Sequence, residues 1–364
     1  MPAEATMPTL SAQGDAREPL RVGLVGYGYA GKTFHAPLIA ATPGLDFACV
    51  ASSDAAKVHA DWPQVDVVAD AQALIARDDI DLVAIATPND THAPLASAAL
   101  RAGKHVVVDK PFALDSGEAR ALIALARERE RLLSVFHNRR WDSDFLGVRQ
   151  AIADGRVGRV AHFESHLDRY RPAVRARWRE GAGRGAGLWF DLGPHLIDQA
   201  LQLFGQPKRV QANFARQRAG ALSEDWAHVV LDYRDGLRVI LHAGMLVAGG
   251  SPRFVVHGER GSLVKHEPDR QEAQLKAGLT PGADGWGADP DAMRFHDGSG
   301  AVRDIPTPPG DQRRYYIGIE RAVRGLGPNP VTAEQALAVM NVLETAQRSA
   351  RESRSLPLPA LAPG

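Results

Sequence analysis

The sequence contains a single cysteine and no long hydrophobic run, and each shortage excludes a class of protein. One thiol, Cys49, cannot close an internal disulfide, which fits a reducing, cytoplasmic compartment rather than the secreted, disulfide-rich class. No stretch approaches the roughly 20 apolar residues of a membrane span. The first 18 residues hold no apolar core of signal-peptide length, so we expect residues 1–18 to form a disordered tail.

The chain also lacks a charge bias, because 43 basic residues stand against 43 acidic ones. Nothing in this balance favours nucleic acid or an anionic membrane surface as a partner. The 13 histidines form no His-x-x-x-His pattern and no paired cysteines accompany them. We therefore expect no metal site.

A glycine-rich loop is the most informative feature that is present. An apolar stretch, 22–25, runs directly into Gly-x-Gly-x-x-Gly. The first glycine permits a tight turn, the second lets the backbone approach a pyrophosphate, and the third lets the next helix pack on the strand. The N-terminus of that helix offers free N–H groups to the phosphates. The loop predicts dinucleotide binding by Gly26, Tyr27, Gly28, Tyr29, Ala30 and Gly31.

The first half of the chain alternates strand-like and helix-like segments. Short apolar runs occur at 21–25, 46–51, 65–68, 82–86, 105–108 and 132–136. Helical patterns lie between them, most clearly at 32–41, 93–102 and 116–131. Strands separated by helices imply right-handed crossovers and a parallel sheet. We therefore predict an α/β fold whose residues 19–137 form an NAD(P)-binding Rossmann domain.

The end of the second predicted strand bears on the choice between NADP and NAD. An acidic residue there would hold the ribose 2′-OH and repel a 2′-phosphate. Ser52 occupies the expected position, followed by Ser53, and a serine can hydrogen-bond a phosphate without repelling it. This favours NADP. NAD stays possible, because a register shift of one or two residues would put Asp54 in place of the serine.

After residue 137 the pattern changes. Strand-like runs at 160–167, 209–214, 228–233, 237–242, 254–257 and 262–265 are separated by tight-turn signals typical of antiparallel pairing. Helical patterns occur at 145–153, 192–203, 312–323 and 332–350, and the Gly-, Pro- and Asp-rich stretch 268–309 is predicted to be loop. We predict a substrate-binding and dimerisation α/β domain over 138–352, with a largely antiparallel open sheet, and a second tail over 353–364. Such a sheet leaves one face free for another subunit, so a homo-oligomer, a dimer or tetramer, is expected.

Three short segments carry candidate chemistry. Lys110 lies at the C-terminal end of a predicted parallel strand, the edge where ligands bind in such sheets, and Pro111 restricts its backbone. Asp191 and His195 are four residues apart, so they share one face of a helix. Their spacing fits an oriented imidazole base or a capping carboxylate beside a packed histidine, and it does not decide between these. The segment 137–142 follows the sixth strand and has the composition of a polar domain junction.

Together these segments resemble the Gfo/Idh/MocA family of oxidoreductases over about residues 20–350. The resemblance rests on four segments in the same order: 26–35, 87–89, 109–111 and 191–195. More narrowly, segments 134–142, 168–172 and 177–180 resemble the branch of NADP-dependent scyllo-inositol dehydrogenases.

The resemblance implies roles for individual residues. Lys110 would bind the reacting oxygen and the nicotinamide ribose, and His195 would be the general base, with Asp191 orienting the substrate or that histidine. Further implied contacts are Thr87, Pro88 and Asn89 to the cofactor, and Asn138, Arg139, Trp141 and Tyr170 to the substrate. One departure is Asp109, where the family usually has glutamate.

The lead hypothesis is therefore an NADP-dependent polyol dehydrogenase, with scyllo-inositol as the first candidate substrate. Other inositols, aldoses and sugar acids fit the same fold, because fold does not fix substrate. Some relatives are NAD-dependent glycoside hydrolases that recycle the cofactor internally, and a non-catalytic dinucleotide sensor is a third possibility. The presence of Lys110, Asp191 and His195 argues against the sensor, which needs no base.

Overall fold

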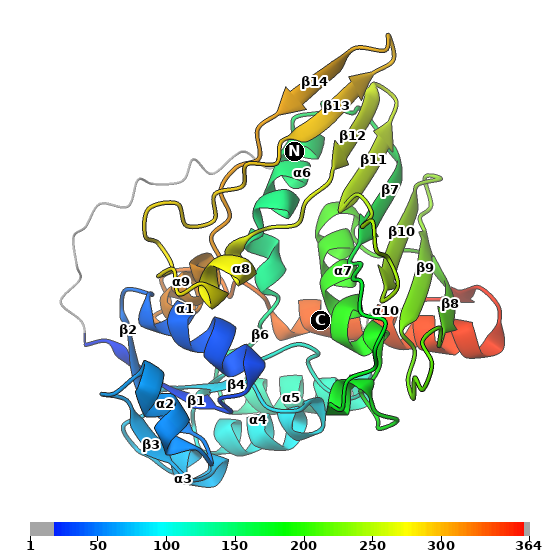
Figure 1. Cartoon of the computed structure of the whole chain (residues 1–364). Coiled ribbons are helices and arrows are strands. Elements are labelled where there is room, and N and C mark those ends of the chain that lie inside the picture. Colours follow the sequence, from blue (N-terminus) through cyan, green and yellow to red (C-terminus); the bar gives the residue numbers. More distant parts are fainter. Residues whose placement is uncertain (1–17, 360–364) are drawn as a thin grey trace.

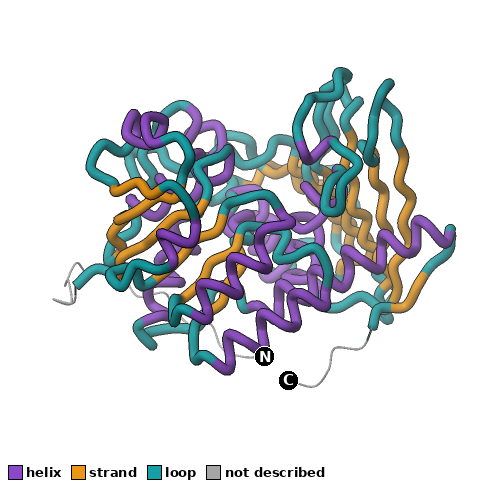
Figure 2. The backbone as a smooth tube through the Cα atoms, turned by 90° about the horizontal axis from the view of Figure 1, so that it is seen from below, coloured by secondary structure: helices purple, strands orange, loops and turns teal. Residues whose placement is uncertain are grey.

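A computed structural model describes residues 18–359, so nearly all of the predicted tail 1–18 and the end of the predicted tail 353–364 lie outside the described residues. The chain builds two sheets, which lie toward opposite ends of the molecule with helices between them (Figures 1 and 2). This arrangement confirms the predicted α/β fold. Within the described part, no helix combines the length and apolar composition needed to cross a bilayer.

The first sheet is parallel, with six strands in the order β3-β2-β1-β4-β5-β6. Its strands are β1 (Leu20–Val25), β2 (Leu45–Ala51), β3 (Asp66–Val68), β4 (Leu82–Ile85), β5 (His105–Val108) and β6 (Leu133–Val135). The helices between them are α1 (Ala36–Ala40), α2 (Ala55–Asp61), α3 (Ala71–Ile75), α4 (His92–Arg101) and α5 (Ser116–Glu128). The strand order reverses between β1 and β4, and in such sheets ligands bind at the carboxyl end of this switch point.

The second sheet has nine strands in the order β14-β13-β12-β11-β7-β10-β9-β8-β15. They are β7 (Val160–His166), β8 (Arg209–Ala215), β9 (Trp226–Asp232), β10 (Arg238–Gly244), β11 (Phe254–Gly258), β12 (Gly261–Lys265), β13 (Met293–Asp297), β14 (Val302–Ile305) and β15 (Leu356–Pro357). All neighbours are antiparallel except β7 and β10. The prediction of a largely antiparallel sheet is confirmed.

Helices cover one face of this sheet and leave the other open (Figure 1). The covering helices are α6 (Ser143–Ala153), α7 (Leu188–Phe204) and α10 (Ala333–Glu352). Burial alternates along the strands accordingly: Phe163 and Ser165 of β7 are buried under the helices, while Glu164 and His166 between and after them are only half-buried. This period of two is what a sheet with one core face requires.

Two predictions about loops and ends need correction. The segment predicted as loop, 268–309, contains α8 (Gln271–Lys276) and the hairpin β13–β14. The glycines and prolines of this segment lie in the connections between these short elements. The predicted tail 353–364 is also partly structured, because β15 pairs with β8 and Leu356 is buried. The Leu356 side chain, directly before Pro357, reaches the core there, which the proline-rich composition of the segment does not indicate.

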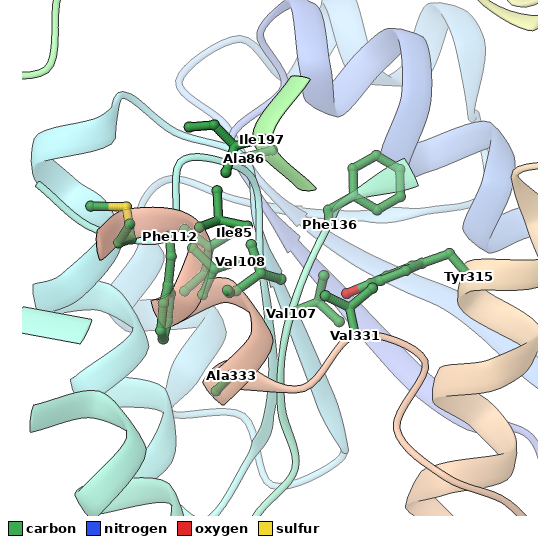
Figure 3. Close-up of a cluster of buried hydrophobic side chains, with 14 of the residues drawn as sticks. Ile85, Ala86, Val107, Val108, Phe112, Phe136, Ile197, Tyr315, Val331 and Ala333 are labelled. Atoms are coloured by element: carbon green, nitrogen blue, oxygen red, sulfur yellow. The ribbon is translucent and has the colours of Figure 1, made fainter. Parts of the chain in front are cut away.

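One apolar core joins the two halves of the chain. Figure 3 shows Val107 and Val108 of β5 close to Tyr315, of helix α9 (Arg313–Val323), and to Val331, which precedes α10. Polar contacts add to this packing at β6, where the Ser134 hydroxyl donates to the Val331 oxygen and the Ser134 backbone forms a bridge with Thr332. Helices α9 and α10 therefore pack at the β5–β6 end of the parallel sheet.

Candidate active site

The glycine loop has the geometry that its sequence predicts. Gly26 has φ = +96°, a conformation that other residues rarely adopt, and a Cβ at Gly31 would lie 2.0 Å from the Gly26 oxygen. A Cβ at Gly28, in contrast, would meet no atom within 4 Å. Gly26 and Gly31 are thus required by the turn itself. Gly28 borders open space, which fits a residue that a pyrophosphate approaches from outside.

A cavity of about 350 Å³ opens next to this loop, at the carboxyl edge of the parallel sheet. Its walls come from both halves of the chain. Seven residues predicted for the site line it: Tyr29, Ala30, Lys110, Asn138, Arg139, Asp191 and His195. The structure therefore brings together Lys110, Asp191 and His195, which span 85 residues of the chain.

Lys110 lies two residues after the end of β5 and points toward the start of α7. Its Nζ donates to the backbone oxygen of Asp191 at 2.6 Å and lies 3.2 Å from the Asp191 carboxylate. Arg179 lies 3.5 Å from the same carboxylate. Burial works against ionisation of Asp191, but these cations outweigh it and hold the pKa of this carboxyl well below its usual range. Asp191 is therefore a permanent anion that anchors Lys110.

The neighbouring residue, Asp109, helps to fix the backbone of Lys110. Its carboxylate accepts a hydrogen bond from the Lys110 backbone N–H at 2.8 Å and lies 3.9 Å from the His35 ring. His35 is fully buried in a π-helical turn, Gly31–His35, and its Nδ1 is 2.6 Å from the Tyr316 hydroxyl. Such turns are frequent at functional sites. His35 thus lies next to Asp109, behind the segment that carries Lys110, and does not line the cavity.

His195 is buried on the cavity wall, one turn along α7 from Asp191. Burial, together with the nearby charges of Lys110 and Arg139, holds its pKa well below the usual value. The imidazole is therefore neutral at physiological pH and free to accept a proton. Among the described residues, Asp191 pairs with Lys110 and Arg179 and forms no hydrogen bond to His195.

The predicted substrate residues divide into two groups. Asn138 and Arg139 line the cavity, where Arg139 is held by ion pairs to Asp142 and Glu272. Trp141 and Tyr170 do not line it. The indole of Trp141, at the end of the 3₁₀ turn Asn138–Trp141, packs edge-on against Tyr315.

Tyr170 is 60% exposed beyond the end of β7, where its backbone forms a bridge with Leu246. Its ring therefore faces solvent and not the cavity, so the substrate contact that the resemblance implied for it lacks support in the structure.

The residues predicted to bind the cofactor lie along the same sheet edge. Ser52 and Ser53 follow β2, and the Ser52 hydroxyl accepts a hydrogen bond from the Asp54 N–H. The Asp54 carboxylate caps α2 by accepting from the Lys57 N–H at 2.9 Å. Thr87, Pro88 and Asn89 follow β4. These contacts to a dinucleotide remain predictions, as do the roles of the glycine-loop side chains, of which Tyr27 is buried against Asp61.

The sequence reasoning missed part of the cavity wall. Five arginines from the segment 169–179 line it: Arg169, Arg171, Arg175, Arg177 and Arg179. Their spacing of two to four residues is visible in the sequence, but it does not by itself indicate that the side chains converge on one cavity. From the other side, Glu272 and Lys276 of α8 approach Tyr29, whose hydroxyl is 2.5 Å from the Glu272 carboxylate. Those two residues lay in the stretch predicted to be loop.

Comparison with known proteins agrees with this architecture over almost the whole chain. Residues 20–137 match the family model described as the oxidoreductase family NAD-binding Rossmann fold, and residues 149–358 match the model of the C-terminal alpha/beta domain of the same family.

Individual relatives match along nearly their full length. YdgJ of Escherichia coli K12, named an uncharacterized oxidoreductase, is 52% identical over 93% of this chain and 98% of its own. IolW of Bacillus subtilis, named an NADP(+) scyllo-inositol 2-dehydrogenase, is 37% identical over 94% and 96%. The crystal structure of a Klebsiella pneumoniae protein named as an oxidoreductase superposes with a TM-score of 0.89 at 56% identity, covering 95% and 96%.

Proposed function

The chain belongs to the Gfo/Idh/MocA oxidoreductase family, and on that premise we propose that it is an NADP-dependent polyol dehydrogenase with scyllo-inositol as the first candidate substrate. The observation that carries the proposal is the cavity in which Lys110, Asp191 and His195 meet beside the glycine loop. A relative that covers nearly the same length and is named for NADP and scyllo-inositol supports the same substrate class.

The cavity residues account for the proton and the charge in such a reaction. A bound nicotinamide would supply the acceptor for the hydride that leaves the hydroxyl carbon. The neutral imidazole of His195 takes the hydroxyl proton, and the Lys110 ammonium stabilises the negative charge that develops on that oxygen. Asp191 holds the ammonium in place through its two contacts and does not itself need to exchange a proton.

The residues at the end of β2 support NADP over NAD. Ser52 stands directly after the strand, where an acidic residue would select the unphosphorylated ribose. Asp54, the acidic alternative, is engaged as the N-cap of α2, so its carboxylate is turned toward the helix N-terminus. Lys57, in the first turn of that helix, donates to the Tyr27 backbone oxygen at 2.9 Å and so places a positive charge next to the glycine loop. The open space beside Gly28 suits the pyrophosphate of either cofactor.

The arginines of the segment 169–179 favour a second candidate, a dehydrogenase of anionic polyols such as sugar acids or sugar phosphates. The cavity wall carries six arginines and two lysines against three carboxylates. Among the described residues, the guanidinium groups of Arg169, Arg171 and Arg175 form no hydrogen bond or ion pair. Burial and the neighbouring arginines lower the pKa of Arg171, a sign of mutual repulsion that a bound anion would relieve.

A steady-state assay at alkaline pH tests the proposal and separates the two candidates. Tag-free protein is offered scyllo-inositol, a neutral aldose, gluconate and a hexose phosphate, each with NADP and NAD, while reduced cofactor is followed by absorbance. We expect reduction with scyllo-inositol and NADP that is lost in His195→Ala. Preference for the anionic compounds, with KM raised in Arg171→Ala but an unchanged Kd for NADPH, would select the second candidate.

Other outcomes would count against the proposal. Reduction with NAD alone would contradict the argument from Ser52. Release of sugar from a glycoside without net reduction would indicate a hydrolase, and tight NADPH binding with no turnover of any compound would leave only a sensor.

A further inference from the structure

A second polar cluster lies on the open face of the nine-stranded sheet, outside the cavity. His166 ends β7 and pairs across the parallel strands with His242 of β10. Asp168 follows His166 by two residues, so its side chain lies on the same face of the sheet. The Asp168 side chain is only 3% exposed, and the two histidine side chains are 16% and 14% exposed. The three groups form a small, nearly enclosed polar site.

The atoms of this cluster face one another without forming hydrogen bonds. Nδ1 of His166 is 3.5 Å from one oxygen of Asp168, and Nε2 of His242 is 3.6 Å from the other. Neither carboxylate oxygen has a hydrogen-bond partner among the described residues, and neither has His166 Nδ1. Asp168 is thus buried at ion-pair distance from two histidines but without a close hydrogen bond, so an ion bound between them would satisfy both oxygens.

The separations match those of atoms that share a metal ion. A proton shared between N and O would bring them to about 2.7–3.2 Å. A tetrahedral ion bound at about 2.0–2.1 Å holds its ligand atoms about 3.4 Å apart. The observed 3.5 and 3.6 Å lie close to the second value, and one ligating atom from each of His166, Asp168 and His242 lies within 4.8 Å of the others.

A further carboxylate orients one of the histidines. Nε2 of His166 lies 2.9 Å from Glu164, whose other oxygen lies 2.7 Å from His162 Nε2. When Nε2 carries a proton and donates it to Glu164, Nδ1 is the nitrogen available to bind an ion beside Asp168. Histidines that bind metals are held in this manner, with the far nitrogen donating to a carboxylate.

We propose that His166, Asp168 and His242 bind one divalent transition-metal ion of the Zn²⁺ class. Two imidazoles and one carboxylate suit such an ion, whereas Mg²⁺ and Ca²⁺ require oxygen ligands. Three protein ligands leave the fourth tetrahedral position to water. The site revises the expectation that the chain has no metal site, which considered only ligands close together in sequence.

The position of the site gives the ion a structural role. Asp168 is followed directly by Arg169, whose side chain lines the cavity on the other side of the backbone, and the Arg169 N–H donates to Gly244 at the end of β10. An ion that joins the ends of β7 and β10 would therefore fix the start of the arginine segment. It takes no part in the hydride transfer proposed above and is tested without reference to that reaction.

Metal binding is measured directly on tag-free, full-length protein that has been stripped with a chelator and dialysed. Titration with Zn²⁺ by calorimetry, and metal content after gel filtration, should give one ion per chain. We expect this ion to be lost in Asp168→Asn and His242→Gln. Glu164→Gln should weaken the affinity by about 10–100-fold, the usual effect of removing a carboxylate that orients a ligand.

His228→Gln is the matched control. His228 of β9 pairs with His242, stacks on Trp226 and contacts the His242 ring edge-on, but it is not one of the three ligand residues, so the variant should keep the full Zn²⁺ content. Loading with Co²⁺ gives a second readout, because wild type should show the visible bands of a low-coordinate Co²⁺ site and Asp168→Asn should not. Circular dichroism confirms that each variant is folded.

Two results would overturn the proposal. One is the absence of a stoichiometric ion in wild type at micromolar Zn²⁺, which would leave the cluster as an ion-pair network. The other is an equal loss of Zn²⁺ in His228→Gln and Asp168→Asn.

Discussion

Lys110 contacts Asp191 at two points, the backbone oxygen at 2.6 Å and the carboxylate at 3.2 Å. An ammonium group has three donors, so one remains for a substrate oxygen in the cavity. The contact also links the end of β5 to the first turn of α7, the helix that carries His195. The position of the lysine and the position of the base are thus set by one interaction between the two halves of the chain.

Replacing the lysine should remove the stabilisation of negative charge on the reacting oxygen. We expect Lys110→Met to lower kcat by about 10²–10³-fold, the usual cost of losing one group that stabilises developing negative charge. Steady-state kinetics with whichever substrate the assay proposed above selects measures this. Lys208→Met, at an exposed lysine far along the chain, should leave kcat unchanged. A Lys110→Met enzyme with wild-type kcat would refute the role.

Removing the imidazole should affect proton transfer alone. His195→Ala should lower kcat by about 10²–10⁴-fold, the range for loss of a general base. Fluorescence titration should give the same Kd for NADPH as wild type. His296→Ala, at an exposed position on β13, serves as the control. If kcat at optimal pH survived the loss of His195, another group would have to take the proton.

Stability should fall on mild acidification because of a second buried histidine. Burial, with the nearby Arg140, lowers the pKa of His137 to about 4, and neither ring nitrogen has a hydrogen-bond partner among the described residues. In the unfolded chain the ring titrates near its usual value of about 6.5. Between these values the unfolded state binds more protons, so the free energy of unfolding decreases as pH falls through this window.

A His137→Phe variant lacks this titration. Its Tm should therefore decrease less than that of wild type between pH 7 and pH 4.5, as measured by calorimetry. Equal decreases of Tm in the two proteins would show that other groups cause the loss of stability at low pH.

The glycine loop offers a matched pair of substitutions. Gly31→Ala places a Cβ against the Gly26 oxygen and should lower Tm, whereas Gly28→Ala meets open space and should leave Tm within about 2 °C of wild type, since surface changes cost little. The bound pyrophosphate would occupy that space, so Gly28→Ala should raise the Kd for NADPH. Calorimetry and cofactor titration measure the two effects. The reverse pattern would contradict the assignment of the two glycines.

An acidic residue at the end of β2 should alter cofactor choice. In Ser52→Asp, a carboxylate near the 2′-phosphate costs about 1–2 kcal/mol, which corresponds to about tenfold weaker use of NADP. The ratio of kcat/KM for NADP to that for NAD should fall accordingly. Ser53→Asp, one residue further along the exposed turn, tests whether position or added charge matters. An unchanged ratio in Ser52→Asp would place the 2′-phosphate elsewhere.

Periodicity and glycine spacing were sufficient to predict most of the fold. Each of the six parallel strands was placed to within about two residues, because a buried parallel strand is a continuous apolar run between turn signals. Helices α2 and α3 were not specified, since short helices capped by Asp54 and Asp70 leave little periodicity. The hairpin β13–β14 was missed because its strands are largely exposed and carry few apolar residues.

The site could be predicted only where motifs are local. Lys110, Asp191 and His195 stand in short motifs, and the fold brings them to one cavity. The ion pair between Lys110 and Asp191 spans 81 residues and had no local signal. The cluster of His166, Asp168 and His242 was missed for the same reason, because its members are adjacent only after β7 and β10 pair.

The bridge between Ser134 and Thr332 has a consequence for the behaviour of the first half on its own. β6 is the outermost strand of the parallel sheet, and the segment that enters α10 lies along its free side. An uncovered strand edge recruits strands from other chains and promotes aggregation. The segment that enters α10 therefore prevents the free edge of β6 from pairing with strands of other copies of the chain. A fragment that ends before residue 331 would lose that protection, however well its six strands paired.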